Sequence, residues 1–221
     1  MTFQFNTVFE YWPMYLEGLR TTIYVTLGSL IFSLILSIPL AMIKITKNKI
    51  LNFIGFLYTD IFRALPSLVQ IYLVYFAAPQ LFGITFTAMT SAFITLSMNA
   101  AAYISEALRG GILSVDIGQR EAAKALGISQ VDTLKDIVLL QALKAVFPSM
   151  INETIGLLKG TSLVSIIGVV DLMRASRQVM ADSYLSFAPL MVAAVIYYIL
   201  VKSMSMIGNR LEKRIRVSEI R

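Results

Sequence analysis

The first feature of the chain is a series of uncharged stretches, each long enough to cross a lipid bilayer. A transmembrane helix needs about 20 consecutive, mainly apolar residues. The first such stretch lies between Arg20 and Lys44, and Pro39 sits near its end. Neighbouring helices can satisfy the carbonyl group that a proline leaves without a donor inside a membrane. We therefore predict one transmembrane helix here, with a kink near its end.

The next uncharged stretch is too long for a single crossing. It extends from Ala64 to Ser105 without any charged residue. Pro79 interrupts it, with a glycine four residues later, and both residue types are typical of turns. We predict two transmembrane helices in this region, at about 53–78 and 84–106, joined by a short turn.

Two more spans follow a charged segment. From Arg109 to Asp136, acidic and basic residues alternate with alanine, leucine and glycine, a pattern typical of short amphipathic helices outside the bilayer. We predict a fourth span at about 145–170 and a fifth from about Leu185 to Val201. The predicted fold class is therefore an all-α, multi-pass membrane protein with about five transmembrane helices.

Composition supports this interpretation and excludes several classes of function. The chain is 57% hydrophobic and 14% charged, whereas a soluble domain of its size needs more polar surface. It contains no cysteine and no histidine, which excludes disulfides, thiolate nucleophiles and histidine-based metal sites. The net charge of +6 does not indicate nucleic-acid binding, because the basic residues flank the apolar segments.

The distribution of lysine and arginine predicts the orientation in the membrane. Cytoplasmic loops carry an excess of these residues. They gather after the first span, in the segment from Arg109 to Lys144, and in the tail from Arg210 to Arg221. With five spans, these three regions share one side only if the N-terminus lies on the other. We therefore predict an external N-terminal segment, 1–18, and a cytoplasmic C-terminus.

A motif in the predicted cytoplasmic segment indicates a family. The chain reads EAAKALGISQVDTLKDIVLL from Glu121 to Leu140. This resembles the EAA motif of ABC importer permeases, in which E-A-A is followed by three residues, G, nine residues, I, one residue and L-P. Only the last position departs from the pattern, because Leu140 stands in place of the proline.

The residues of this motif suit a docking surface. Ala122 and Ala123 give a short helix a small, flat face that a groove on another protein can approach closely. Gly127 supplies a left-handed or tightly turned position at the end of that helix, and Glu121 can cap its start or pair with a basic residue of the partner. The alternative is an ordinary amphipathic helix with a glycine cap. The family resemblance implies that these four residues couple the chain to an ATPase.

The resemblance extends over about 20–210 and indicates the polar amino acid branch of these permeases. The stretch YISEALRGGI at 103–112 resembles their Y-x-x-E-x-x-R-G-G-I pattern, and RALPSLVQ at 63–70 resembles R-G-T-P-L-L-V-Q. LLKGTSLV at 157–164 is similar to L-L-K-D-T-S-L-V, with Gly160 in place of the usual acidic residue.

This resemblance implies a type I ABC importer permease fold with a cytoplasmic coupling helix. Two permease subunits, with a homodimer favoured over a pair of paralogues, would enclose the pathway in a bacterial cytoplasmic membrane, in contact with lipid. An ABC ATPase subunit would bind ATP and Mg²⁺, and an extracytoplasmic binding protein would deliver the amino acid. The chain has no GxxxxGK[ST] phosphate loop, so we expect a transporter subunit without a cofactor, not an enzyme. The permease domain is expected at 19–209 and a basic cytoplasmic tail at 210–221.

Glu153 is the strongest candidate for substrate binding. An ionisable residue inside a span is costly and usually functional, and a buried carboxylate needs a partner. Gly156, Leu157 and Gly160 share its helical face, and the two glycines leave room for a ligand. A cationic side chain or the α-ammonium group of a substrate would suit the carboxylate. The alternative is a structural pair with Lys159, which lies on another face, or with a basic residue of a neighbouring helix.

Two other polar positions are candidates for the same substrate-binding site. Asn99 lies in the third span, with Tyr103 one turn further on, and an amide can donate to a carboxylate and accept from an ammonium group. Hydrogen bonding between helices is an equally good explanation for Asn99. Ser67 follows Pro66, where an irregular helix would bring it to the same cavity, although a structural role is favoured.

The sequence thus predicts the transmembrane subunit of an ATP-driven importer for a basic amino acid, which is arginine, lysine or histidine. The reason is that the helical face of Glu153 offers no basic partner. One alternative is an ion- or proton-coupled carrier or channel with Glu153 as protonation site, which leaves the EAA segment without a role. Another is the membrane anchor of an enzyme complex, for which the chain has no cofactor ligands.

A solvated outer loop is favoured over contact with a binding protein for three charged residues: Asp171, Arg174 and Arg177.

Overall fold

The computed structural model describes residues 5–217, which form helices joined by short turns, with no strand among them. Segments η1 and η2 are π-helical, and η3 is a 3₁₀ helix. In chain order the elements are α1 (Phe5–Glu10), α2 (Trp12–Ile45), α3 (Lys49–Ala64), α4 (Ser67–Tyr72), η1 (Leu73–Ala77), α5 (Ala78–Phe82), α6 (Ala88–Ser114), α7 (Ile117–Ala125), α8 (Gln130–Asp132), η2 (Thr133–Val138), α9 (Leu139–Gly160), η3 (Thr161–Ile167), α10 (Leu172–Ser183) and α11 (Phe187–Val217).

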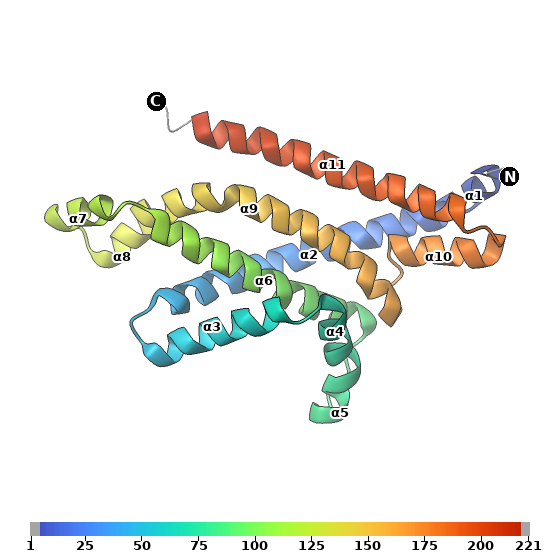
Figure 1. The fold of residues 1–221 in the computed structure, drawn as a ribbon, viewed down its shortest axis with the longest axis horizontal. Helices are drawn as coiled ribbons and strands as arrows, with labels where there is room; N and C mark the ends of the chain where they lie inside the picture. Colours follow the sequence, from blue (N-terminus) through green and yellow to red (C-terminus); the bar gives the residue numbers. More distant parts are fainter. Residues whose placement is uncertain (1–4, 218–221) are drawn as a thin grey trace.

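The long helices run between two opposite ends of an elongated bundle (Figure 1). The N-terminal end, α1 and α10 lie at one end, whereas α7, α8 and the turn between α2 and α3 lie at the other. Helix α11 runs from the first end toward the second. The EAA segment in α7 and the end of the C-terminal helix therefore lie on the same side of the bundle, opposite the N-terminus.

The predicted passes correspond to long helices and to bent helix pairs of the bundle. Among residues 5–217, α2 and α11 are long and apolar enough to span a membrane, and the total rises to four if two bent helix pairs each count as one span. Helix α6, which is 27 residues long, supplies the remaining pass through the middle of the bundle (Figure 1). Its many small and polar residues suit a helix that packs against other helices instead of lipid. The predicted all-α, multi-pass class is confirmed.

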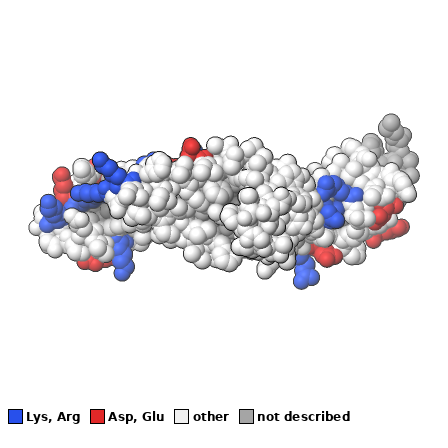
Figure 2. Space-filling view, turned by 90° about the horizontal axis from the view of Figure 1, so that it is seen from below, with Lys and Arg blue, Asp and Glu red and all other residues white. Residues whose placement is uncertain are grey.

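Charge is distributed as expected for a membrane-embedded bundle. Figure 2 shows acidic and basic atoms gathered at both ends of the molecule, with a broad band between them that carries few charges. A charged group in the hydrocarbon region is costly, whereas the ends reach water and lipid headgroups. The view therefore agrees with helices that run across the membrane along the long axis of the bundle.

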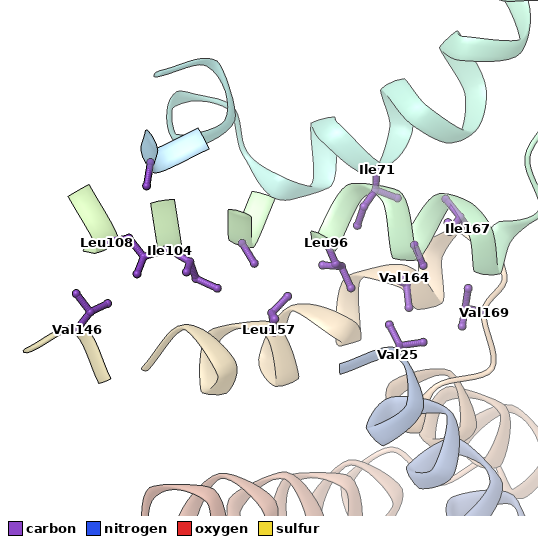
Figure 3. Packing of buried hydrophobic residues seen from close by; sticks show 13 residues of the cluster. Val25, Ile71, Leu96, Ile104, Leu108, Val146, Leu157, Val164, Ile167 and Val169 are labelled. Atoms are coloured by element: carbon purple, nitrogen blue, oxygen red, sulfur yellow. The ribbon is translucent and has the colours of Figure 1, made fainter. Parts of the chain in front are cut away.

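Helix α6 is the centre of the packing, with α2, α3 and α9 against it. Figure 3 shows apolar side chains from separate elements meeting along α6, among them Val25, Leu96, Ile104, Leu157 and Val164. The α2 face that is buried in the bundle is instead lined by small hydroxyl residues at a spacing of three or four. These residues are Thr22, Thr26, Ser29, Ser33 and Ser37, each at most 2% exposed. Small residues between helices permit close approach inside a bilayer.

The second span is broken, so the prediction of one helix at 53–78 is wrong. Helix α3 ends at Ala64 and α4 begins at Ser67, and the chain bends by 106° between them. Pro66 has no N–H group and disfavours helical geometry at the residue before it. Leu65 accordingly has extended backbone angles, φ −82° and ψ 136°. The apolar run forms one helix along the bundle and a second arm, α4 to α5, that leaves it at the side (Figure 1).

Two charged residues that were predicted to lie outside the spans belong to the long helices α2 and α6. Lys44, predicted in the first cytoplasmic loop, is in the last turn of α2 and is buried. Helix α6 continues beyond its predicted end to Ser114, so Arg109 is still part of it. Lys44 donates to side chains of α3 and α6. Arg109 pairs with Glu106 of its own helix and lies over the ring of Phe56 in α3. These partners allow the helices to continue past the two charges.

The favoured expectation of a solvated loop around Asp171 is wrong, because this segment is a helix start. Asp171 is 0% exposed, and its carboxylate accepts hydrogen bonds from the backbone N–H groups of Met173 and Arg174 in α10. Arg177 donates from Nη2 to Ser165 Oγ at 3.0 Å. The carboxylate caps α10, a common role for aspartate at the first turn of a helix.

The predicted division into segments remains a prediction. Helix α2 begins at Trp12, so the expected boundary between 1–18 and 19–209 lies inside one helix. The tail expected at 210–221 begins within α11, and its last four residues lie outside the described residues.

Candidate functional site

Two amide side chains stabilise the break between α3 and α4. Gln70 of α4, which is 3% exposed, donates from Nε2 to the carbonyl oxygens of Phe62 and Leu65, both at 2.8 Å. Asn99 of α6 donates from Nδ2 to the carbonyl oxygen of Phe62 and to Gln70 Oε1, both at 3.1 Å. The last carbonyl groups of a helix have no partner within it. These four bonds, which we call the Gln70–Asn99 network, satisfy the groups that the break exposes.

The Gln70–Asn99 network gives Asn99 a structural role, and the helix break that it stabilises lies next to Ser67. Asn99 forms the interhelical hydrogen bonds that were the alternative to substrate contact. Both N–H groups of its amide are engaged, so it cannot donate to a substrate carboxylate in this conformation. Ser67 is half-buried in the first turn of α4, directly after the break, which confirms the predicted helix irregularity at this point.

The last turn of α3 brings Arg63 to the same region. Its guanidinium group lies over the ring of Tyr103, at 5.4 Å from the ring centre. Arg63 is also the cation that interacts electrostatically with Glu153 of α9, although no direct ion pair joins the two in the described part of the chain. Arg63 thus contacts one predicted site residue, Tyr103, and interacts electrostatically with another, Glu153. In the sequence, Arg63 was noted only as part of the motif at 63–70.

Glu153 is half-buried beside an open face of α9. A Cβ atom added to Gly156 would meet nothing within 4 Å, whereas one added to Gly160, the other glycine predicted to leave room, would lie 3.6 Å from Leu96 Cδ2. The exposed residues of this face recur every three or four positions and are all small or polar: Gln141, Ala145, Ser149, Asn152, Gly156 and Lys159. We call them the polar stripe. A face in contact with lipid would be apolar, so the stripe is suited to contact with water or protein.

Leu157, predicted to share the site with Glu153, belongs to the core instead. It is 6% exposed and packs in the cluster that also contains Leu96 and Ile104 (Figure 3). Four residues correspond to slightly more than one helical turn, and this offset directs Leu157 toward α6. Since its side chain is used for packing, we do not include Leu157 in the site proposed below.

A second polar cluster joins three helices nearer the α7 end. The buried ammonium group of Lys44 is 2.9 Å from Glu106 Oε2 and donates to Ser105 Oγ at 3.0 Å and Thr59 Oγ1 at 3.1 Å. Glu106 also pairs with Arg109, one turn later on α6. A buried charge is tolerated only when it is paired and hydrogen-bonded. The cluster therefore holds α2, α3 and α6 together. Sequence reasoning missed it because Lys44 was assigned to a loop.

The EAA segment forms α7, which begins after Asp116. The carboxylate of Asp116 accepts from the backbone N–H of Gly118 at 2.6 Å and caps the helix, so Glu121 lies mid-helix and does not cap its start. Glu121 and Ala122 are exposed, whereas Ala123 is 2% exposed. Of the three residues of the E-A-A sequence, Glu121 and Ala122 are therefore available for contact with another protein.

The end of α7 has the geometry that the motif predicted. Gly127 has φ +77°, a left-handed conformation that favours glycine. The N–H groups of Gly127 and Ile128 donate to the carbonyl oxygens of Lys124 and Ala123, a common way to close a helix. Further on, Leu140 stands in place of the family proline, and the chain continues helically through it without a break.

Comparison with known proteins agrees with this architecture. Residues 29–217 match the family described as binding-protein-dependent transport system inner membrane component. The chain is 43% identical over 202 residues, 91% of its length and 93% of the relative's, to a protein of Rickettsia bellii provisionally named glutamine transport system permease protein GlnP. It is 38% identical over 219 residues, 99% of its length and 100% of the relative's, to the arginine transport system permease protein ArtQ of Bacillus subtilis.

A solved structure extends this agreement to three dimensions. A chain from a crystal structure described as an amino acid ABC transporter with histidines matches with a TM-score of 0.91 at 31% identity, covering 97% of the present chain and 100% of that chain. The helical fold, the candidate membrane spans and the family match together show which family the protein belongs to. It belongs to the binding-protein-dependent transport system inner membrane components and is a permease subunit of an amino acid ABC transporter, not itself an enzyme.

Proposed function

We propose that this chain lines the pathway of an ATP-driven importer for a basic amino acid, which is arginine, lysine or histidine, in a bacterial cytoplasmic membrane. The observation that carries the proposal is the polar stripe of α9, which runs beside the half-buried Glu153. Permeases of this family act with an ABC ATPase and a binding protein. The chain needs no cofactor of its own, because the ATPase would bind ATP and Mg²⁺.

The polar stripe supports an arrangement of two permease subunits around one pathway. Its side chains are exposed in the single chain, yet they lie on a membrane helix and are poorly suited to lipid. Two copies that face each other through their stripes would enclose a polar path and shield it from the bilayer. Two-fold pairs of identical subunits are the commonest oligomers, so we favour a homodimer over a pair of paralogues.

The surroundings of Glu153 support a cationic substrate. Arg63 interacts electrostatically with Glu153, but its guanidinium group lies over the ring of Tyr103 and forms no direct ion pair with the carboxylate among the described residues. Glu153 therefore keeps its capacity for a second cation, and a guanidinium group can donate two parallel hydrogen bonds to it. An acidic substrate would bring a second negative charge. Relatives are named for arginine and for glutamine, and the carboxylate favours the basic amino acid.

The substitution Glu153→Gln tests this proposal. It keeps the shape of the side chain and removes the charge that the substrate would neutralise. We expect arginine-stimulated ATP hydrolysis by the purified complex to fall about tenfold or more, as for the loss of a hydrogen bond to a charged group. Half-saturating arginine concentration and maximal rate are measured in proteoliposomes.

Asp60→Asn is the matched control, because it neutralises another carboxylate within a membrane helix, on α3. We expect that variant to respond to arginine as the unchanged protein does. Normal arginine transport by Glu153→Gln would contradict the proposal. So would a wild-type complex that responds to glutamate and ignores the basic amino acids.

The proposed topology, with the N-terminus outside, is tested with single cysteines in this cysteine-free chain. Glu10→Cys in α1 should react with a membrane-impermeant maleimide in intact cells. Val131→Cys, at a side chain 73% exposed near the α7 end, should react only after the membrane is permeabilised. The two positions lie at opposite ends of the bundle (Figure 1), so labelling of both in intact cells would contradict the proposed orientation.

A further inference from the structure

We propose that Arg63 binds the α-carboxylate of the transported amino acid and that the Gln70–Asn99 network positions it for this role. The inference rests on the proposed function, because it assigns the second charged contact of the same site. It identifies the substrate class as α-amino acids with a free carboxylate, which would bind more tightly than the corresponding amines.

Arg63 lies at a depth where a charge needs a protein or aqueous environment. It is fourteen residues after Lys49, the first residue of α3, which corresponds to about 21 Å along the helix. Its side chain is exposed in the single chain. An arginine at such a depth faces the interior of a bundle or a water-filled cavity, and it marks a substrate or ion pathway more often than a structural position.

The guanidinium group of Arg63 contacts an aromatic ring, and its N–H groups are unengaged among the described residues. Its Cζ atom lies over the ring of Tyr103, 5.4 Å from the ring centre. Among residues 5–217, no hydrogen bond or ion pair uses the N–H groups of Arg63. A guanidinium presents its donors in a planar fork that matches a carboxylate with two parallel bonds. The cation–π contact with Tyr103 uses none of these N–H donors, so the fork remains available for a carboxylate.

The Gln70–Asn99 network fixes the backbone from which Arg63 projects. Phe62, the residue before Arg63, has its carbonyl oxygen bonded to both amides, at 2.8 Å and 3.1 Å. A helix that stops at a proline would otherwise fray in its last turn, because its carbonyl groups lack partners. Gln70 and Asn99 are therefore positioning residues. They hold the last turn of α3 against α6, which also carries Tyr103.

Arg63 and Glu153 together match the charge pattern of an amino acid. They interact through space but are not joined directly in the described chain. A zwitterion placed between them would give its carboxylate to Arg63 and a cationic group to Glu153. Each protein charge would then gain a partner at the moment of binding, which offsets the cost of keeping both charges in the membrane region.

The test compares two ligands that differ only in the carboxylate, L-arginine and its decarboxylated form, agmatine. Calorimetric titration of the purified permease–ATPase complex in detergent measures both affinities without selection by a binding protein. We expect the wild-type complex to bind arginine at least about tenfold more tightly than agmatine. Arg63→Gln should weaken arginine binding by a similar factor and leave agmatine binding nearly unchanged, so that the ratio approaches one. Arg63→Lys should retain part of the preference.

The positioning role has its own readout. Gln70→Leu keeps the volume and removes the amide, and it should reduce the preference for arginine several-fold. The combination Gln70→Leu with Arg63→Gln should show no loss of preference beyond that of Arg63→Gln alone. Thermal unfolding of each variant separates misfolding from weakened binding, and Arg63→Lys serves as the test if Arg63→Gln does not fold.

The outcomes that would contradict the role of Arg63, the basic substrate or both proposals differ from one another in these measurements. Equal weakening of arginine and agmatine by Arg63→Gln would overturn the inference and leave Arg63 as a structural counter-charge of Glu153. If the wild-type complex binds a neutral amino acid and not arginine, the basic substrate is wrong, and the same comparison of that amino acid with its amine decides the role of Arg63. A complex that binds no amino acid would overturn both proposals.

Discussion

Replacing Glu121 by lysine should abolish ATP-driven uptake while the permease still folds in the membrane. Glu121 and Ala122 are exposed on α7, whereas Ala123 is buried against the bundle. The exposed pair offers a surface for the ATPase, and the charge reversal changes that surface without disturbing the core. Closure of the ATPase must move this helix if it is to reorient the spans, so loss of the contact ends transport although the pathway is intact.

The contacts of α7 support this coupling route. Arg120 donates from Nη2 to the carbonyl oxygen of Ile112, near the end of α6, at 2.7 Å. Helix α6 continues from there to Tyr103 and Asn99, so a displacement of α7 acts on a helix of the candidate site. Gly127→Pro should also abolish uptake, because φ +77° is not available to proline, whose φ is fixed near −65°.

Uptake of labelled substrate by cells measures the effect, and co-purification of the ATPase reports whether the contact survives. Gln119→Lys is the control for Glu121→Lys, since it also introduces a lysine, on another side of α7. We expect near-normal uptake in that control. Near-normal uptake in Glu121→Lys or Gly127→Pro would contradict the coupling role of the EAA segment.

Glu106→Ala should lower the free energy of unfolding by about 3–5 kcal/mol, the range for removing one partner of a buried ion pair. Lys44 is 3% exposed, and its strongest partner is the carboxylate of Glu106 at 2.9 Å. Without that carboxylate the ammonium group keeps only the hydroxyl groups of Ser105 and Thr59. The midpoint of thermal unfolding of the purified permease in detergent measures the change.

Two further substitutions separate charge burial from general damage. Lys44→Met removes the buried cation itself and leaves Glu106 paired with Arg109, so we expect a smaller loss than for Glu106→Ala. Arg109→Gln breaks the more exposed pair and should cost about 1 kcal/mol or less. A loss for Glu106→Ala no greater than that for Arg109→Gln would show that the Lys44 cluster does not stabilise the bundle.

Local and periodic features were predictable from the sequence alone. Uncharged runs indicated the membrane passes, because the cost of burying a charge in lipid depends on residue type and little on fold. The spacing of the EAA segment indicated a short helix closed by Gly127, and φ at that residue confirms it. Of the two glycines expected to leave room beside Glu153, Gly156 faces open space, whereas Gly160 lies close to Leu96, because neighbouring helices decide whether the space beside a small residue is filled.

The partners of polar groups were decided only by the tertiary structure. Pro66 indicated an irregularity in the helix, but not the bend of 106°. The bend is stabilised by Gln70 of α4 and by Asn99, which comes from α6, a separate helix later in the chain. Lys44 reads as the charged end of a span, yet it is buried because Glu106 meets it from another helix. Leu157 shares a nominal helical face with Glu153, and the position of α6 separates the two. Residue type sets what each group costs to bury, whereas the packing of distant helices determines which partner offsets that cost.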